Sequence, residues 1–258
     1  MNDRASHLKL ALIGSEGMLA TAVKQAAGDA WSILPLDLPG FDLTDRAQVL
    51  RIMDEAQPDV IINCAAYTNV DRCETEEALA TRVNGEGVGY LAEAAQKTGA
   101  TLVHISTDYV FAGSKRTPYV ETDPTGPVSA YGRSKLAGEQ AILASGLQKS
   151  FIIRTSWLYG PNGNNFVETI LRLAAEREEL GIVADQVGSP TYTGDLAEAV
   201  FALLDKVKSS SLQPSPARGE DVASASSPYG IYHFSNLGQC SWFEFAGEIF
   251  TQARSLGM

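Results

Sequence analysis

The stretch LALIGSEGMLATAV, residues 10–23, joins a short apolar run to a helical pattern through two glycines. Gly14 closes the apolar run, Gly17 follows three residues later, and Ala20 takes the third small position of this spacing. A strand that turns tightly into a helix is typical of the first βαβ unit of a dinucleotide-binding fold. The helix N-terminus there offers free N–H groups and partial positive charge to a diphosphate. The stretch therefore predicts a parallel α/β fold with a cofactor at this turn.

Further apolar runs follow along the chain, and helix-length amphipathic stretches separate them. We expect strands at 8–13, 32–36, 59–63, 101–106 and 150–155, and helices near 18–27, 45–56, 77–98 and 130–145. Strands that are apolar on both faces and alternate with helices predict a doubly wound parallel sheet. Residues 1–155 are thus expected to form a Rossmann-type domain that binds NAD(P).

The pattern loosens beyond residue 155. We expect a helix near 165–177, a strand at 180–183, a helix at 193–206, a strand at 230–236 and a helix at 241–253. Residues 208–228 are rich in Ser, Pro and Ala and predict a mobile loop, because such a segment buries too little apolar surface to offset its ordering entropy. Residues 156–258 should mainly form a small substrate-binding lobe, with helix 193–206 packing back onto the first domain.

Composition excludes several classes of protein. The net charge of −11 argues against a broad nucleic-acid surface, which needs excess Lys and Arg. No apolar stretch approaches the roughly 20 residues of a membrane span, and the first 30 residues lack the apolar region of a signal peptide. Cys64, Cys73 and Cys240 have no zinc-site spacing, and their odd, sparse number fits a reducing compartment. We expect a cytoplasmic enzyme with neither nucleic acid nor a membrane as partner.

An acidic residue, Asp37, lies at the end of the expected second strand. A carboxylate there would accept hydrogen bonds from the adenosine ribose and repel a 2′-phosphate, which favours NADH over NADPH. Asp42 and Leu43 would flank the adenine, and the small residues Ala65 and Ala66 would leave room for the cofactor. A turn aspartate and tight sheet packing explain the same residues without a cofactor.

Two further stretches, HISTDYVF (104–111) and AYGRSK (130–135), carry residues for proton transfer. Thr107 is expected at the carboxyl end of the fourth strand, where ligands bind in open α/β sheets. Tyr131 and Lys135 stand four residues apart at a helix start and share one face. The lysine ammonium would favour the phenolate, so Tyr131 would exchange a proton with the substrate while Thr107 holds the substrate oxygen. Alone, the Tyr–Lys pair is better explained as an exposed helix pair, and the upstream glycine turn together with the Ser-Thr at the strand end is what favours catalysis.

The order of four short motifs along the chain resembles that of the extended short-chain dehydrogenase/reductase family. The motifs are Gly-x-x-Gly, Asn-x-Ala-Ala, Ser-Thr and Tyr-x-x-x-Lys. Longer stretches narrow the resemblance to the dTDP-4-dehydrorhamnose reductases: residues 59–84, 104–113, 118–140, 154–160, 185–197 and 230–246. That family reduces the C4 keto group of dTDP-4-dehydro-L-rhamnose with NADPH or NADH, in the last step of dTDP-L-rhamnose synthesis. The resemblance therefore implies a nucleotide-sugar substrate.

The resemblance also implies roles for individual residues. Thr107, Tyr131 and Lys135 would be catalytic. Thr107 and Asp108 would touch the sugar, and Trp157 would offer a face to the hexose ring, although without the resemblance core packing is the better explanation for this tryptophan. Cofactor contacts are expected at Gly14, Gly17, Met18, Leu19, Asp37, Asp42, Leu43, Ala65, Ala66, Tyr67, Thr68, Ile105, Tyr131 and Lys135.

The chain also departs from the family pattern. Ala20 replaces a common glycine, and Met18 replaces a frequent glutamine. Segment 208–228 has no family counterpart, and the chain stops at Met258, earlier than members usually do, so the resemblance leaves full substrate affinity open. Some members are magnesium-dependent dimers, which raises Mg²⁺ and a homodimer, although no ligand cluster in the sequence supports a metal site.

Two alternative interpretations stay open. The first is another nucleotide-sugar epimerase or reductase of the same superfamily. A 4,6-dehydratase would need an acidic pair, and here Asp108 is followed by Tyr109, but an epimerase keeps the same Tyr and Lys. The second is a non-catalytic, NADP-binding regulatory subunit that resembles that of methionine adenosyltransferase.

Overall fold

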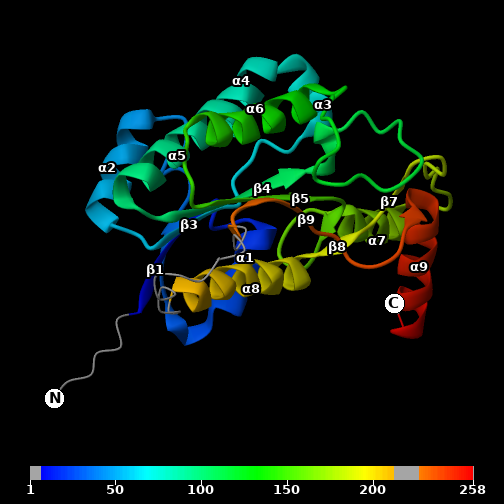
Figure 1. The fold of residues 1–258 in the computed structure, drawn as a ribbon. Helices are drawn as coiled ribbons and strands as arrows, with labels where there is room; N and C mark the ends of the chain where they lie inside the picture. The colour runs from blue at the N-terminus through cyan, green and yellow to red at the C-terminus, as the bar shows by residue number, and fades with distance from the viewer. Residues whose placement is uncertain (1–6, 212–226, 258) are drawn as a thin grey trace, which may run out of the picture.

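Six parallel strands form the central sheet of this computed structural model, which describes residues 7–211 and 227–257 (Figure 1). Their order is β2–β1–β3–β4–β5–β9. The bounds are β1 Leu8–Ile13, β2 Trp31–Leu36, β3 Val60–Asn63, β4 Thr101–Thr107, β5 Ser150–Thr155 and β9 Gly230–His233. The predicted doubly wound parallel sheet is confirmed, and each of the first five strands lies within one residue of its expected bounds.

Helices cover both faces of the sheet. On one face lie α1 Met18–Ala27 and α8 Thr193–Ser211, and on the other lie α2 Arg46–Ala56, α5 Gly87–Thr98 and α6 Ala130–Ala144 (Figure 1). Successive side chains of β1 point to opposite faces of the sheet. Leu10 and Leu12 pack into the core under α1 and α8, while Ala11 and Ile13 pack into the core under α2, α5 and α6. Since both faces are buried, the strand is apolar at successive positions.

The strand order reverses between β1 and β3. The chain leaves β1 through α1 to reach β2 on one side, and it then returns through α2 to β3 on the other side. These two helices lie on opposite faces, so a crevice opens between the carboxyl ends of β1 and β3. The glycine turn that follows β1 lies at this crevice.

The helix expected at 77–98 is divided into three parts. It consists of α4 Glu77–Thr81, a π-helical turn at Arg82–Glu86 and α5, and a separate helix, α3 Val70–Thr75, precedes it. Asn84 lies in the π-helical turn and is completely buried. A π-turn inserts one residue into a helix and often marks a functional position.

The C-terminal part differs more from expectation. Helices α7 Phe166–Glu176 and α9 Trp242–Ser255 confirm two predictions. The strand predicted at 180–183 is wrong: this segment has no regular secondary structure, and its apolar side chains pack against α7 and α9 instead. Four two-residue strands were not expected, because two residues carry no periodicity: β6 Leu158–Tyr159, β7 Val187–Gly188, β8 Thr191–Tyr192 and β10 Cys240–Ser241.

The boundary expected at residue 155 does not separate the sheet from the rest in space. Strand β9 pairs with β5, which the expected division does not include, whereas α8 packs on α1 as expected for helix 193–206. Within the predicted loop 208–228, residues 208–211 belong to α8, and residues 212–226 lie outside the described part. Across residues 7–211 and 227–257, every helix is too short or too polar to cross a membrane.

Candidate active site at the carboxyl ends of the strands

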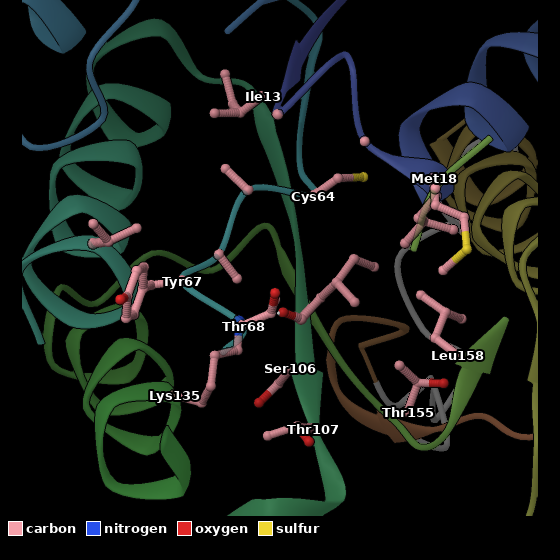
Figure 2. Close-up of a pocket in the computed structure, with 18 of the residues that line it drawn as sticks. Ile13, Met18, Cys64, Tyr67, Thr68, Ser106, Thr107, Lys135, Thr155 and Leu158 are labelled. Atoms are coloured by element: carbon pink, nitrogen blue, oxygen red, sulfur yellow. Dashed lines mark hydrogen bonds between the residues drawn. The ribbon is translucent and has the colours of Figure 1, made fainter. Parts of the chain in front are cut away.

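A cavity of about 890 Å³ opens at the carboxyl ends of the strands (Figure 2). Every residue predicted to contact the cofactor or the substrate lines it, from Gly14 after β1 to Trp157 after β5. Its volume lies within the usual range for small-molecule and cofactor sites. In Figure 2, Met18 and Leu158 lie on one side of the cavity, and Tyr67 and Lys135 lie on the other.

The glycine turn takes the shape that a diphosphate requires. Gly14 has a φ of +71°, and a side chain there would come within 2.7 Å of the backbone nitrogen of Ala65. Gly17 is the N-cap of α1, where no side chain caps the helix and the first turn carries no acid. The first N–H groups of α1 thus remain for an anion, and the turn fits a bound dinucleotide.

Asp37 connects this turn to the end of β2. Its Oδ2 accepts a hydrogen bond from the backbone N–H of Glu16 at 2.8 Å, and its Oδ1 accepts one from Leu38 at 2.9 Å. The carboxylate therefore fixes the glycine turn as well as facing the cavity. Asp42 nearby accepts hydrogen bonds from the backbone and hydroxyl of Thr44, both at 2.8 Å, and these bonds lower the pKa of Asp42.

Thr107 ends β4 inside the cavity. Its Oγ1 accepts a hydrogen bond from the backbone N–H of Tyr109 at 3.2 Å and donates one to Asp108 at 3.1 Å. Burial raises the pKa of Asp108 to about 6, although the hydrogen bond from Thr107 opposes this rise. A carboxyl group with this pKa changes its charge close to neutral pH.

Tyr131 and Lys135 lie on α6 beside that strand end. Burial raises the pKa of Tyr131, and a hydrogen bond with Thr107 only partly opposes the rise. Lys135 is 2% exposed and donates a hydrogen bond from Nζ to the carbonyl of Ile105 at 2.7 Å. Burial lowers the pKa of Lys135 to about 8, while the negative charge of Glu139 opposes this fall.

The expectation that Lys135 favours the phenolate of Tyr131 stays a prediction. In this structure burial is the main influence on the Tyr131 pKa, and the charges of Asp108 and Tyr109 raise that pKa further. The lysine amine instead turns to the Ile105 carbonyl. A phenol with a raised pKa keeps its proton at neutral pH, which suits a proton donor better than a base.

Asn84 was not among the predicted site residues, but it is buried at the site. Its Oδ1 accepts from the backbone N–H of Tyr67 at 2.8 Å, and its Nδ2 donates to the Tyr67 carbonyl at 3.0 Å and to Ser134 Oγ at 2.9 Å. Ser134 in turn donates to the carbonyl of Tyr131 at 2.7 Å. This network joins the loop after β3 to the start of α6. The sequence did contain a signal for this position. Asn84 is followed by a glycine inside a helical pattern, and both residue types are poor helix formers.

Trp157 lies at the cavity wall, but another tryptophan covers part of it. Its ring stacks on that of Trp242, with the centroids 3.6 Å apart and the planes 12° apart. The backbone of Trp157 has a φ of +47°, and a side chain at Gly188 would come within 2.6 Å of its ring. Trp242 was not predicted as a site residue because it stands far along the chain from Trp157.

The described residues include no cluster of side chains that would hold Mg²⁺ by itself. Over residues 7–211 and 227–257, no three His, Cys, Asp or Glu side chains are grouped so that they would hold a metal ion. The cavity instead combines an uncapped helix N-terminus with Thr107, Tyr131 and Lys135, which are groups for binding an anion and moving a proton.

Comparison with known proteins finds relatives that match almost the whole chain. The family model described as the RmlD substrate binding domain matches residues 8–257. A dTDP-4-dehydrorhamnose reductase of Aggregatibacter actinomycetemcomitans is 43% identical over 247 residues, which cover 95% of this chain and 79% of the relative. The spore coat polysaccharide biosynthesis protein SpsK of Bacillus subtilis is 42% identical over 95% of this chain and 79% of its own length. The crystal structure of a dTDP-4-dehydrorhamnose reductase from Bacillus anthracis in complex with NADP superposes with a TM-score of 0.86, at 42% identity, covering 97% of this chain and 82% of that one.

Proposed function

This chain belongs to the family of the RmlD substrate binding domain, and we propose that it is the NAD(P)H-dependent oxidoreductase that converts dTDP-4-dehydro-L-rhamnose to dTDP-L-rhamnose. Relatives that carry the name dTDP-4-dehydrorhamnose reductase match 95% of the chain, and a similar structure holds NADP. The reaction completes the synthesis of a nucleotide sugar that serves polysaccharide assembly.

The observation that carries the proposal is the convergence of three groups in one cavity: Thr107 at the end of β4, and Tyr131 and Lys135 on α6. A reduced nicotinamide, when bound, supplies the hydride for the sugar C4. The Thr107 hydroxyl orients the keto oxygen. The Tyr131 phenol gives its proton to that oxygen as it becomes a hydroxyl, and a donor so placed contributes roughly 10²–10⁴-fold to the rate. The Lys135 ammonium supports the site with positive charge and would contact the nicotinamide ribose of a bound cofactor.

The cofactor would lie along the crevice between β1 and β3. The N-terminus of α1 would bind its diphosphate, and Asp37 would face the adenosine ribose. A carboxylate at that position repels a 2′-phosphate, so the proposal includes a preference for NADH over NADPH. No step of the proposed reaction uses Mg²⁺, and a homodimer and a cytoplasmic location remain predictions from the sequence.

The test is direct. The protein is mixed with dTDP-4-dehydro-L-rhamnose and either NADH or NADPH, and the loss of reduced nicotinamide is followed by its absorbance. Turnover with at least one cofactor is expected. Absence of turnover with both would contradict the proposal: tightly retained, non-exchanging NAD would then favour an epimerase, and NADPH binding without turnover would favour a regulatory subunit.

A further inference from the structure

A buried ion pair lies beneath the proposed catalytic groups. Arg154 on β5 and Glu139 on α6 are 5% and 1% exposed. Arg154 donates from Nη2 to one carboxylate oxygen of Glu139 at 2.7 Å and from Nε to the other at 3.0 Å. Ser106 on β4 adds a third hydrogen bond, from its Oγ to Glu139 Oε1 at 2.5 Å. Glu139 is thus held by two strands at once.

These contacts fix the height of α6 along the sheet. Ser106 and Arg154 are paired neighbours in the register of β4 and β5. Glu139 follows Lys135 by four residues, so the two side chains lie on one face of α6. One turn of α6 is anchored by Lys135 on the carbonyl of Ile105, and the next turn is anchored by Glu139 on Ser106. Thr107 is the following residue of the same strand.

Stability alone does not account for such a pair, because replacing a buried ion pair with apolar residues is often neutral or stabilising. The negative charge of Glu139 instead acts on the neighbouring amine of Lys135. Lys135 is buried, and no carboxylate in the described part of the chain is bonded to its amine. Glu139 is the carboxylate that raises the pKa of Lys135 against the effect of burial.

The other titratable groups around Lys135 contribute less charge. Cys64, from the loop after β3, has a pKa raised to about 12 by burial and stays a neutral thiol. His104 on β4 has a pKa well below its usual value, again because of burial, and stays uncharged. Tyr131, on α6 itself, keeps its proton. Arg154 on β5 faces Glu139 rather than Lys135.

We propose that Glu139, held by Arg154, is a positioning residue for the reductase: it sets the register of Lys135 and Tyr131 against Thr107 and keeps the Lys135 amine charged. This inference rests on the proposed function. Glu139 does not line the cavity, so it acts through Lys135 and Ser106 and not on the substrate.

The test uses two variants and a matched control. The first variant, Glu139→Gln, removes the negative charge and nearly preserves the shape of the side chain. The second combines Glu139→Leu with Arg154→Met, which replaces the ion pair by apolar side chains so that no charge is left buried alone. The control is Glu93→Gln, because Arg46 and Glu93 form the same two-bond fork, at 2.7 and 2.9 Å, on the surface of α5. For each protein we would measure the melting temperature, the pH profile of kcat, and the titration of Lys135 by ¹³C NMR of lysine Cε without cofactor, assigned with Lys135→Met.

In Glu139→Gln, the amine of Lys135 is expected to lose its proton at a lower pH than in the wild type. The decrease of kcat at alkaline pH should then also begin at a lower pH. A displaced catalytic group costs up to about 10²-fold, so kcat at neutral pH should fall by roughly 10- to 100-fold, with a smaller change in cofactor KM. The double variant should fold and remain slow, and the control should match wild type.

A folded double variant with wild-type kcat, or an unchanged Lys135 titration in Glu139→Gln, would overturn the inference. If Glu139→Gln does not fold, the double variant still decides it. If wild type itself turns over no keto-sugar, the proposed function fails, whereas the NMR titration of the cofactor-free protein still tests the link between Glu139 and Lys135.

Discussion

The phenol of Tyr131 is partly buried, and burial raises its pKa. The phenol is therefore protonated at neutral pH, which is the form that the reduction of a ketone requires. The neighbouring Asp108 and Lys135 have pKa values near neutrality, about 6 and about 8. Their charges, unlike the proton of Tyr131, change over the pH range in which such an enzyme works.

Removing the phenol oxygen should separate binding from chemistry. Tyr131→Phe is expected to bind the cofactor as wild type does but to lose roughly 10²–10⁴-fold in kcat, because the proton donor is gone. Cofactor affinity is measured by fluorescence titration, and kcat by steady-state turnover. Tyr90→Phe, on α5 outside the cavity, is the matched control. Near-wild-type turnover in Tyr131→Phe would show that another group donates the proton.

The pH dependence of kcat/KM should be bell-shaped. Lys135 must be charged, so the rate falls as pH rises through about 8. Asp108 must be ionised to accept from a sugar hydroxyl, so the rate falls as pH decreases through about 6. The profile of kcat/KM reports these pKa values for the free enzyme. Asp108→Asn should abolish the decrease of kcat/KM at acid pH and leave the decrease at alkaline pH. If the variant keeps both, Asp108 is not the group that causes the decrease at acid pH.

At the scale of elements, close packing between helices holds the site. A side chain added at Gly138 of α6 would come within 2.2 Å of the carbonyl oxygen of Asn84 in the π-helical turn. Since Asn84 also holds Tyr67 and Ser134, the contact between α6 and this turn places both the cofactor loop and the helix that carries Tyr131. Only a glycine allows these two backbones to approach so closely.

Two Gly→Ala substitutions test this packing. Gly138→Ala is expected to destabilise the protein by about 1–3 kcal/mol, because it overpacks a rigid contact. Gly247→Ala, in α9, meets no atom within 4 Å and should stabilise the protein by about 0.5–1 kcal/mol, because alanine has the higher helix propensity. Urea denaturation measures both. A neutral effect of Gly138→Ala would mean that the two helices separate easily.

The sequence predicts local elements well and distant contacts poorly. Strand β1, the glycine turn and α1 were expected within a residue, because Gly14 and Gly17 interrupt two clear hydrophobic periods. The stacking of Trp157 on Trp242 and the fork between Glu139 and Arg154 were not expected, since partners far apart along the chain leave no local signal. The segment 180–183 looked like a strand because it is apolar, yet its side chains pack between helices α7 and α9.

At the scale of the whole molecule, the two helical layers and the C-terminal part of the chain meet at one cavity. The loop after β6 reaches α1: a side chain at Gly163 would come within 2.9 Å of Met18, and Asn165 donates to the Met18 sulfur at 3.5 Å. Trp242 brings α9 to the same cavity. A ligand that fills the cavity therefore contacts both parts of the chain and should stabilise the fold as a unit.

Cofactor binding should raise the melting temperature. A ligand at 100 times its Kd stabilises the folded state by about 2.7 kcal/mol, and NADH should act at lower concentration than NADPH because of Asp37. Gly14→Ala should abolish the effect, since its φ of +71° and the 2.7 Å approach to Ala65 exclude a side chain. Thermal unfolding with each nucleotide measures this, and equal stabilisation of Gly14→Ala and wild type would place the cofactor elsewhere.

The central claim is that this cavity transfers a hydride to C4 of a nucleotide-linked keto-sugar while Tyr131 supplies the proton. The most direct measurement uses NADH that carries deuterium at its transferable position, with dTDP-4-dehydro-L-rhamnose as substrate and NMR of the product. We expect dTDP-L-rhamnose with one deuterium at C4 and one NAD⁺ formed for each sugar. Product without deuterium at C4, or an isomerised sugar without net oxidation of NADH, would contradict it.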